Sequence, residues 1–308
     1  MLSAIAATLA IVAIGYFLKR QDFLPNPIWQ SLSPLCYWVL FPGLLFDVMT
    51  TMELSAAVLG PFSLTIACGS VIIVCFAIAG GKAAGMDGPA HSSLVQGALR
   101  HNGFLVLSIL QGAFGIVAMQ LAAVAIAILV PISNIVSVIA VLMMTGKGRD
   151  RCMKRAIFAE ILRNPLLVSL ALGLGVNLLD IPVPSFIAGA AAMLGDGALP
   201  LLLLSIGASL RFSAIRGNAL PLGLAIAAKT FVFPMALLGI GLLLELDALS
   251  LAVLAAIGAA PTANSSYTLA VELGGDARLM AEIISTQTVV AALSMPFWIW
   301  AAGRLAQI

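Results

Sequence analysis

Two charged side chains stand inside long apolar stretches of this sequence, where a charge is costly. Arg100 interrupts the run 92–112, and Lys229 lies in the middle of the run 218–244. A cation at the centre of a membrane helix costs about 2.5–3.5 kcal/mol on insertion scales, so it normally faces a cavity or a partner. A guanidinium can hold a carboxylate through two parallel hydrogen bonds. Arg100 therefore indicates an anion site, unless it reaches a membrane surface or pairs with an acid.

Polar residues next to Arg100 predict a helix break. His101 and Asn102 follow it, and Gly103 permits backbone conformations that other residues resist. The Asn102 amide would donate to a carboxylate, or would satisfy backbone groups freed by the break. His101 would act as a protonation switch near neutral pH, or as a hydrogen-bonded structural residue.

The run 248–272 carries a second break. Pro261 removes a backbone donor, and Asn264 and Ser265 follow it. Helix ends freed at such breaks expose N–H groups that attract anions. The expected substrate-binding residues are Arg100, His101, Asn102, Gly103, Pro261, Asn264 and Ser265.

Lys229 needs a partner, and the sequence leaves its identity open. Asp47, Glu160 and Asp196 are the candidate acids. A pair such as Lys229 with Asp47 would carry a coupling proton, or would only fix packing.

The composition places these residues in a membrane protein. Charged residues make up 9% of the 308 positions and hydrophobic residues 62%, which excludes both a wet globular surface and a disordered chain. The net charge of +2 gives no nucleic-acid signature. With four cysteines, no CxxC pair and two histidines, no metal or cofactor is expected. The chain has no phosphate-loop motif and no convincing catalytic constellation, so we expect a protein that is not an enzyme.

The predicted fold is all-α and polytopic, because the apolar runs are long and lack the alternation of a barrel. Ten transmembrane helices are expected, with ends uncertain by a few residues: 2–18, 31–49, 55–80, 92–112, 115–144, 157–179, 185–210, 218–244, 248–272 and 279–302.

Lysine and arginine lie almost entirely on one side of these spans. The loops after every odd-numbered span carry such residues, namely Lys19, Arg20, Lys82, Lys147, Arg149, Arg151, Lys154, Arg155, Arg211, Arg216 and Arg278. Arg304 lies on the other side. The positive-inside rule then places both termini outside and the basic loop 145–156 in the cytoplasm. That loop serves as a topology anchor, or binds anionic lipid head groups.

The basic linker 145–156 divides the chain into 1–144 and 157–308, each with five predicted spans. An odd number of spans per half makes the two repeats inverted. Traces of the repeat survive, since Gly97–Gly103 parallels Gly258–Asn264 at an offset of 161. Inverted repeats are typical of secondary transporters, which bind substrate where broken helices meet.

Three segments carry a resemblance to a known family: 162–166 (LRNPL), 173–184 (GLGVNLLDIPVP) and 204–210 (LSIGASL). With the ten spans, they resemble the auxin efflux carrier family, which includes plant PIN-FORMED carriers and bacterial organic-acid transporters. A more distant resemblance, in architecture only, is to bile acid sodium symporters. The family resemblance implies a scaffold domain and a transport domain, crossing broken helices in spans 4 and 9, and a homodimer. The family's site residues carry over to Asn102, Pro261 and Asn264.

The sequence therefore predicts a secondary transporter of a small organic anion, in the bacterial inner membrane. The anion would be a malonate-like carboxylate or indole-3-acetate, moved by an elevator mechanism and coupled to protons or sodium, or to neither. The alternatives are a sodium-coupled symporter of the bile-acid type and a membrane binder that does not transport.

Overall fold

The computed structural model describes residues 2–52, 56–146, 164–210 and 219–306. Within these ranges the protein is helical and has no β-strand. Six of the helices described are long and apolar enough to cross a membrane: Asn26–Thr50, Val58–Ala83, Ile116–Met144, Ser185–Ser209, Ala219–Leu243 and Ala277–Leu305. The expected all-α membrane class is therefore confirmed, and the ten-span inverted repeat stays a prediction.

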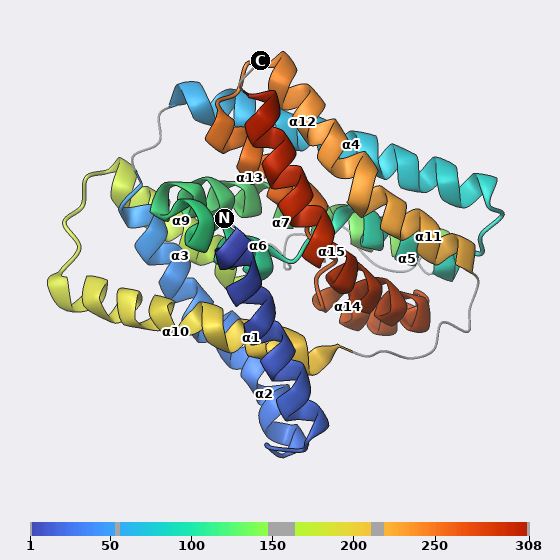
Figure 1. Cartoon of the computed structure of the whole chain (residues 1–308), viewed down its shortest axis with the longest axis horizontal. Helices are drawn as coiled ribbons and strands as arrows, with labels where there is room; N and C mark the ends of the chain where they lie inside the picture. The colour runs from blue at the N-terminus through green and yellow to red at the C-terminus, as the bar shows by residue number, and fades with distance from the viewer. Residues whose placement is uncertain (1, 53–55, 147–163, 211–218, 307–308) are drawn as a thin grey trace. The chain divides into compact units, whose positions relative to one another are not determined.

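The helices follow one another along the chain as Figure 1 shows. Their bounds are α1 Leu2–Arg20, α2 Asn26–Leu35, α3 Phe41–Thr50, α4 Ala56–Ala83, α5 Gly88–Leu99, α6 Gly103–Phe114, α7 Ile116–Met144, α9 Pro165–Leu178, α10 Ser185–Ser209, α11 Ala219–Ala227, α12 Phe233–Leu243, α13 Ala248–Ala259, α14 Ser265–Leu273 and α15 Ala277–Leu305. The central basic loop, Glu160, Arg163 and the start of predicted span 6 lie outside the described residues.

The chain forms two compact units, and each takes segments from both halves of the sequence. Unit 1 comprises 1–54, 104–127 and 159–210, and unit 2 comprises 55–103, 128–158 and 211–308. The bounds of these units do not coincide with those of the two predicted repeats, which stay a prediction. Both predicted breaks belong to unit 2. The helix that follows the first break, α6, begins at Gly103 and continues into unit 1.

In unit 1, glycines allow helices to pack at backbone distance. α1 packs along α10, and a Cβ added at Gly207 would overlap the Val12 carbonyl oxygen. α3 packs on α9 in the same way, because a Cβ at Gly173 would lie 2.7 Å from the Cβ of Met49. Close approach through small residues is the usual packing mode of membrane helices.

Asn164 and Asn177, from the segments that carry the family resemblance, make structural hydrogen bonds in unit 1. Asn164 accepts the Leu166 N–H at 3.0 Å and so caps the N-terminus of α9. Asn177 donates to the carbonyls of Thr50 and Met52, at 2.9 and 3.1 Å, beside the C-terminus of α3. These asparagines satisfy backbone groups that lipid cannot satisfy.

In unit 2, Pro234 shapes the helix that carries Lys229. A proline cannot donate to the carbonyl four residues earlier, which here belongs to Thr230. The chain widens into a π-helical turn over Ala228–Val232 directly before α12. The indole N–H of Trp298, on α15, donates to the Thr230 carbonyl at 2.6 Å. α15 is thereby tied to the turn on which Lys229 lies.

Candidate functional site

Two helices of unit 2 end in extended backbone at the residues where breaks were predicted. α5 ends at Leu99, and Arg100 is extended, with φ −64° and ψ 142°. α13 ends at Ala259, and Ala260 is extended with nearly the same angles, −66° and 139°. Pro261 accounts for the second break, since a proline disfavours the helical conformation of the residue before it. No proline stands at the first break.

The two breaks touch each other through backbone and side-chain hydrogen bonds. The Asn102 N–H donates to the Pro261 carbonyl at 2.7 Å. The Thr262 hydroxyl donates to the Gly97 carbonyl at 2.9 Å. His101, Asn102 and Thr262 are all buried. The crossing therefore places buried polar groups within an apolar helical unit.

Arg100 and Lys229 place two buried cations at this crossing. The Arg100 Nη2 donates to the hydroxyl of Ser265 at 2.9 Å, and so joins the first break to the start of α14. The Lys229 Nζ lies 3.4 Å from the Leu99 carbonyl oxygen and 4.9 Å from the centre of the Phe233 ring. Carbonyl and ring contacts of this kind stabilise an ammonium without neutralising it.

Lys229 has no carboxylate partner among the residues that the structure describes. Its side chain is 2% exposed, and the ion pair found in the described ranges joins Arg278 to Glu282 instead. Two of the candidate acids, Asp47 and Asp196, belong to unit 1, whereas Lys229 belongs to unit 2. A Lys229–Asp47 pair remains a prediction.

The remaining predicted site residues occupy the break segments. Asn264 immediately precedes α14, but its side chain makes no capping hydrogen bond to that helix. Gly103 begins α6. The structure thus brings together the breaks, the two cations and Ser265, and their role in binding remains a prediction.

Sequence reasoning missed two residues at the crossing, Thr262 and Gln287. Thr262 is fully buried, and Gln287 of α15 accepts its backbone N–H at 2.9 Å. The available signal was the polar run 285–288 in the middle of the predicted span 279–302.

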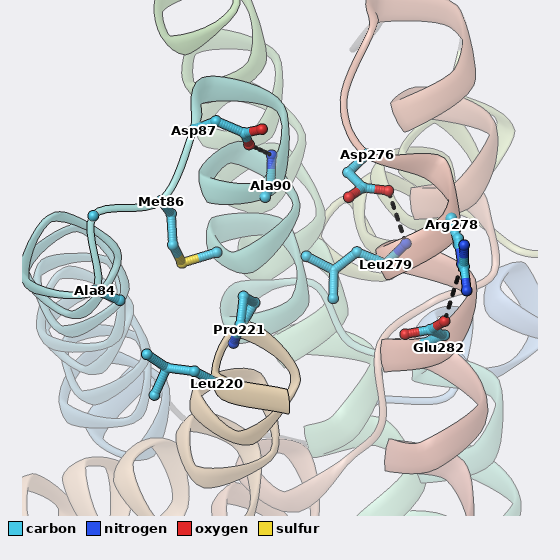
Figure 2. A pocket seen from close by; sticks show the side chains of 11 residues that line it. Ala84, Met86, Asp87, Ala90, Leu220, Pro221, Asp276, Arg278, Leu279 and Glu282 are labelled. Atoms are coloured by element: carbon cyan, nitrogen blue, oxygen red, sulfur yellow. Dashed lines mark hydrogen bonds and ion pairs between the residues drawn. The ribbon is translucent and has the colours of Figure 1, made fainter. Parts of the chain in front are cut away.

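A pocket of about 600 Å³ lies at the other end of α5. Figure 2 shows Met86, Asp87, Asp276 and Glu282 around it, with Leu220 and Pro221 from α11. α5 has 12 residues, so about 18 Å of helix separate this pocket from the break.

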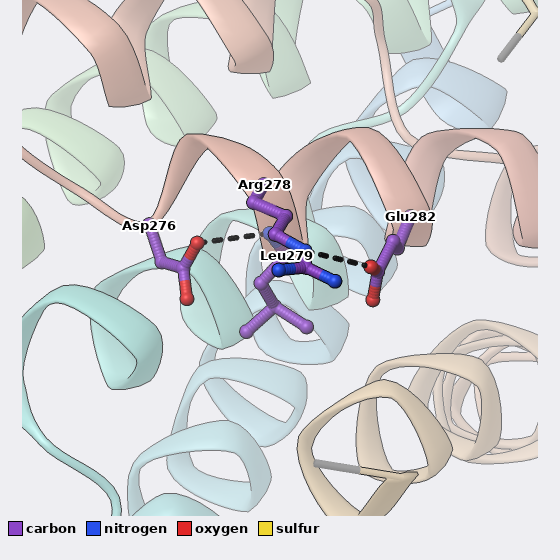
Figure 3. A network of polar contacts seen from close by, with 4 residues as sticks. All are labelled: Asp276, Arg278, Leu279 and Glu282. Carbon is purple, nitrogen blue, oxygen red and sulfur yellow. Dashed lines mark hydrogen bonds and ion pairs between the residues drawn. The ribbon is translucent and has the colours of Figure 1, made fainter. Parts of the chain in front are cut away.

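Two of the acids that line this pocket serve the local structure. Asp87 and Asp276 accept the N–H groups of Ala90 and Leu279, each at 2.9 Å, and so cap α5 and α15. Figure 3 shows Arg278 reaching Glu282 one turn along α15, at 3.4 Å. These acids therefore cap helices or form an ion pair, and the pocket is distinct from the crossing.

Helices long and apolar enough to cross a membrane, with two cations buried at a helix crossing, are typical of an integral membrane protein. Comparison with known proteins agrees with that class: the sequence profile of the family described as "Membrane transport protein" matches residues 1–299. The chain belongs to this family, the PIN-like auxin efflux carrier family. It is also 26% identical, over 96% of both chains, to a protein named "Uncharacterized transporter" from Methanothermobacter thermautotrophicus.

Proposed function

We propose that this protein is a secondary transporter of a small organic anion, whose carboxylate binds at the crossing of the two breaks. The observation that carries the proposal is the buried Lys229 ammonium, which no described carboxylate neutralises. Arg100 lies at the end of the same helix whose Leu99 carbonyl contacts Lys229. A buried cation without a counter-charge is costly, and an anionic substrate would remove that cost.

The proposed transport mechanism is elevator-type alternating access between inverted repeats. Repeat-related positions support it, because structural features recur at nearly constant offsets. Asp87 and Asp247 cap α5 and α13, 160 residues apart. Asp22 and Asp180, 158 residues apart, both adopt positive φ, at 51° and 50°. α7 and α15 have 29 residues each. Such pairing of features is expected when two halves share one ancestral structure.

Malonate-like carboxylates and indole-3-acetate both suit this site, and so does coupling to protons or sodium. We further propose that the protein lies in the bacterial plasma membrane, that both of its termini are outside the cell, and that it forms a homodimer. These proposals follow the family and the loop charges rather than a contact in the site.

Counterflow in proteoliposomes tests the transport proposal. Wild-type protein should exchange radiolabelled malonate or indole-3-acetate, and a sodium gradient identifies sodium coupling. Arg100→Gln and Lys229→Met should each raise the apparent Km by ~10-fold or more, since each loses a charge-assisted contact. Lys82→Gln is the matched control, because Lys82 is an exposed cation at the end of α4.

Unchanged Km values in both site variants would show that the anion does not bind at the crossing. Ligand binding in detergent with no counterflow by the wild type would identify a binder instead of a transporter.

A further inference from the structure

Gln287 makes three hydrogen bonds and one further short polar contact from one buried side chain. Its Oε1 accepts from the Thr262 N–H at 2.9 Å and lies 2.7 Å from the Thr262 hydroxyl. Its Nε2 donates to the carbonyls of Gly97 and Ala225, at 3.0 and 2.8 Å. Both amide hydrogens are therefore used, and Oε1 accepts at least the Thr262 N–H, since the single Thr262 hydroxyl hydrogen also has the Gly97 carbonyl within reach. The side chain is 2% exposed.

The groups that Gln287 binds at the breaks are those that the breaks set free. In α5 the Arg100 N–H still bonds to the Gln96 carbonyl, at 2.9 Å. Gly97 is the next residue, and its helical donor would be His101, which already lies beyond the helix. Thr262 follows Pro261 in the second break. Gln287 thus supplies a donor to one broken helix and an acceptor to the other.

The third contact reaches the segment that carries Lys229. Ala225 lies one turn before Lys229, where α11 passes into the π-helical turn. Close packing allows the reach, since a Cβ at Gly97 would lie 2.9 Å from Ile283 of α15. One amide group on α15 therefore joins both breaks to the helix of the buried ammonium.

We infer that Gln287 is a positioning residue of the anion site: it holds the break that carries Arg100 in register with the turn that carries Lys229. This inference rests on the proposed function. Gln287 orients these cations through the backbone and does not need to touch the substrate. Charge-assisted binding depends on the spacing of its donors, so a loosened register weakens the binding of the anion.

Only glutamine has both the donors and acceptors and the side-chain length that these contacts require. Glutamate offers acceptors alone and would face two carbonyl oxygens. Methionine keeps the volume but removes every hydrogen bond. Asparagine keeps the amide but is one methylene shorter, so it cannot reach all three segments at once.

The test compares Gln287→Met, Gln287→Glu and Gln287→Asn with the matched control Gln120→Met. Gln120 is also buried, and it donates to the Thr51 carbonyl at 3.0 Å within unit 1. Km and Vmax for malonate and for indole-3-acetate are measured by counterflow. Hydrogen–deuterium exchange of peptides covering 94–103 and 258–266 reports the order of the two breaks without any substrate.

The Gln287 variants should exchange faster in both peptides and should raise Km by ~10-fold or more with a smaller change in Vmax. Gln120→Met should leave Km unchanged at a comparable loss of thermal stability. A Gln287→Asn protein that folds and keeps the wild-type Km overturns the inference.

Failure of the inference and failure of the proposed function give different results. If Arg100→Gln and Lys229→Met raise Km while the folded Gln287 variants do not, the transport site stands and the positioning role is wrong. If the wild type neither binds nor exchanges either acid, the proposed function fails and the positioning role fails with it.

Discussion

At the scale of single residues, the cost of a freed backbone group decides which polar side chains occur in the membrane-spanning helices. Pro234 deprives the Thr230 carbonyl of its helical donor, and Trp298 supplies a replacement. Gln287 donates to the freed Gly97 carbonyl, which also accepts from the Thr262 hydroxyl. Each side chain stands in an apolar helix because lipid offers no hydrogen bond to an orphaned carbonyl.

Trp298→Phe should lower the stability of unit 2. Phenylalanine keeps an aromatic side chain, although a smaller one, but leaves the Thr230 carbonyl without its 2.6 Å donor, at a cost of about 1–3 kcal/mol. Thermal unfolding in detergent measures the loss. Trp300→Phe is the control, because Trp300 is 51% exposed. Equal melting temperatures for the two variants would contradict this account.

At the scale of elements, glycine positions determine which helices can touch. Gly207 brings α10 against the backbone of α1, whereas an added Cβ at Gly239 of α12 would have nothing within 4 Å. Glycine therefore has a packing function at Gly207 and none at Gly239.

Gly207→Ala should separate α1 from α10, because the new methyl group would overlap a backbone carbonyl that cannot turn away. Overpacking of this kind costs about 1–3 kcal/mol. Gly239→Ala should be neutral or stabilising, by up to about 1 kcal/mol, because alanine favours the helix. Melting temperatures of the two proteins compare them directly. A stabilised Gly207→Ala protein would show that the helices are not in backbone contact.

At the scale of the whole molecule, the two compact units do not correspond to the two halves of the sequence. Each unit combines segments from both halves of the chain. The positive-inside rule predicts how the chain is oriented in the membrane, which the packing of the helices does not test. The orientation of the chain therefore needs an experiment of its own.

Impermeant maleimide labelling of intact cells tests that orientation. In a background without Cys36, Cys68, Cys75 and Cys152, Leu179→Cys should react from outside. Lys82→Cys should react only after the cells are opened. Both positions are exposed at helix ends. The opposite labelling pattern would reverse the predicted topology.

Much of the candidate site is visible in the sequence because its signals are local. Arg100, Pro261 and Lys229 are visible as charges or a proline inside apolar runs, and the cost of each in lipid marks it without an alignment. The breaks at Leu99 and Ala259 followed from the same reasoning. The partners did not follow, since a hydrogen bond such as that of Gln287 to Gly97 joins residues 190 positions apart.

The sequence by itself determined the membrane class, the helical fold and the positions of the two breaks, because hydropathy, charge and proline act within a few residues of where they stand. Only the tertiary structure decided that the breaks meet, that Lys229 lies at the end of α5, and that Gln287 joins all three segments. The physical reason is that every backbone group freed in an apolar unit needs a partner, and packing alone selects which distant side chain arrives to supply it.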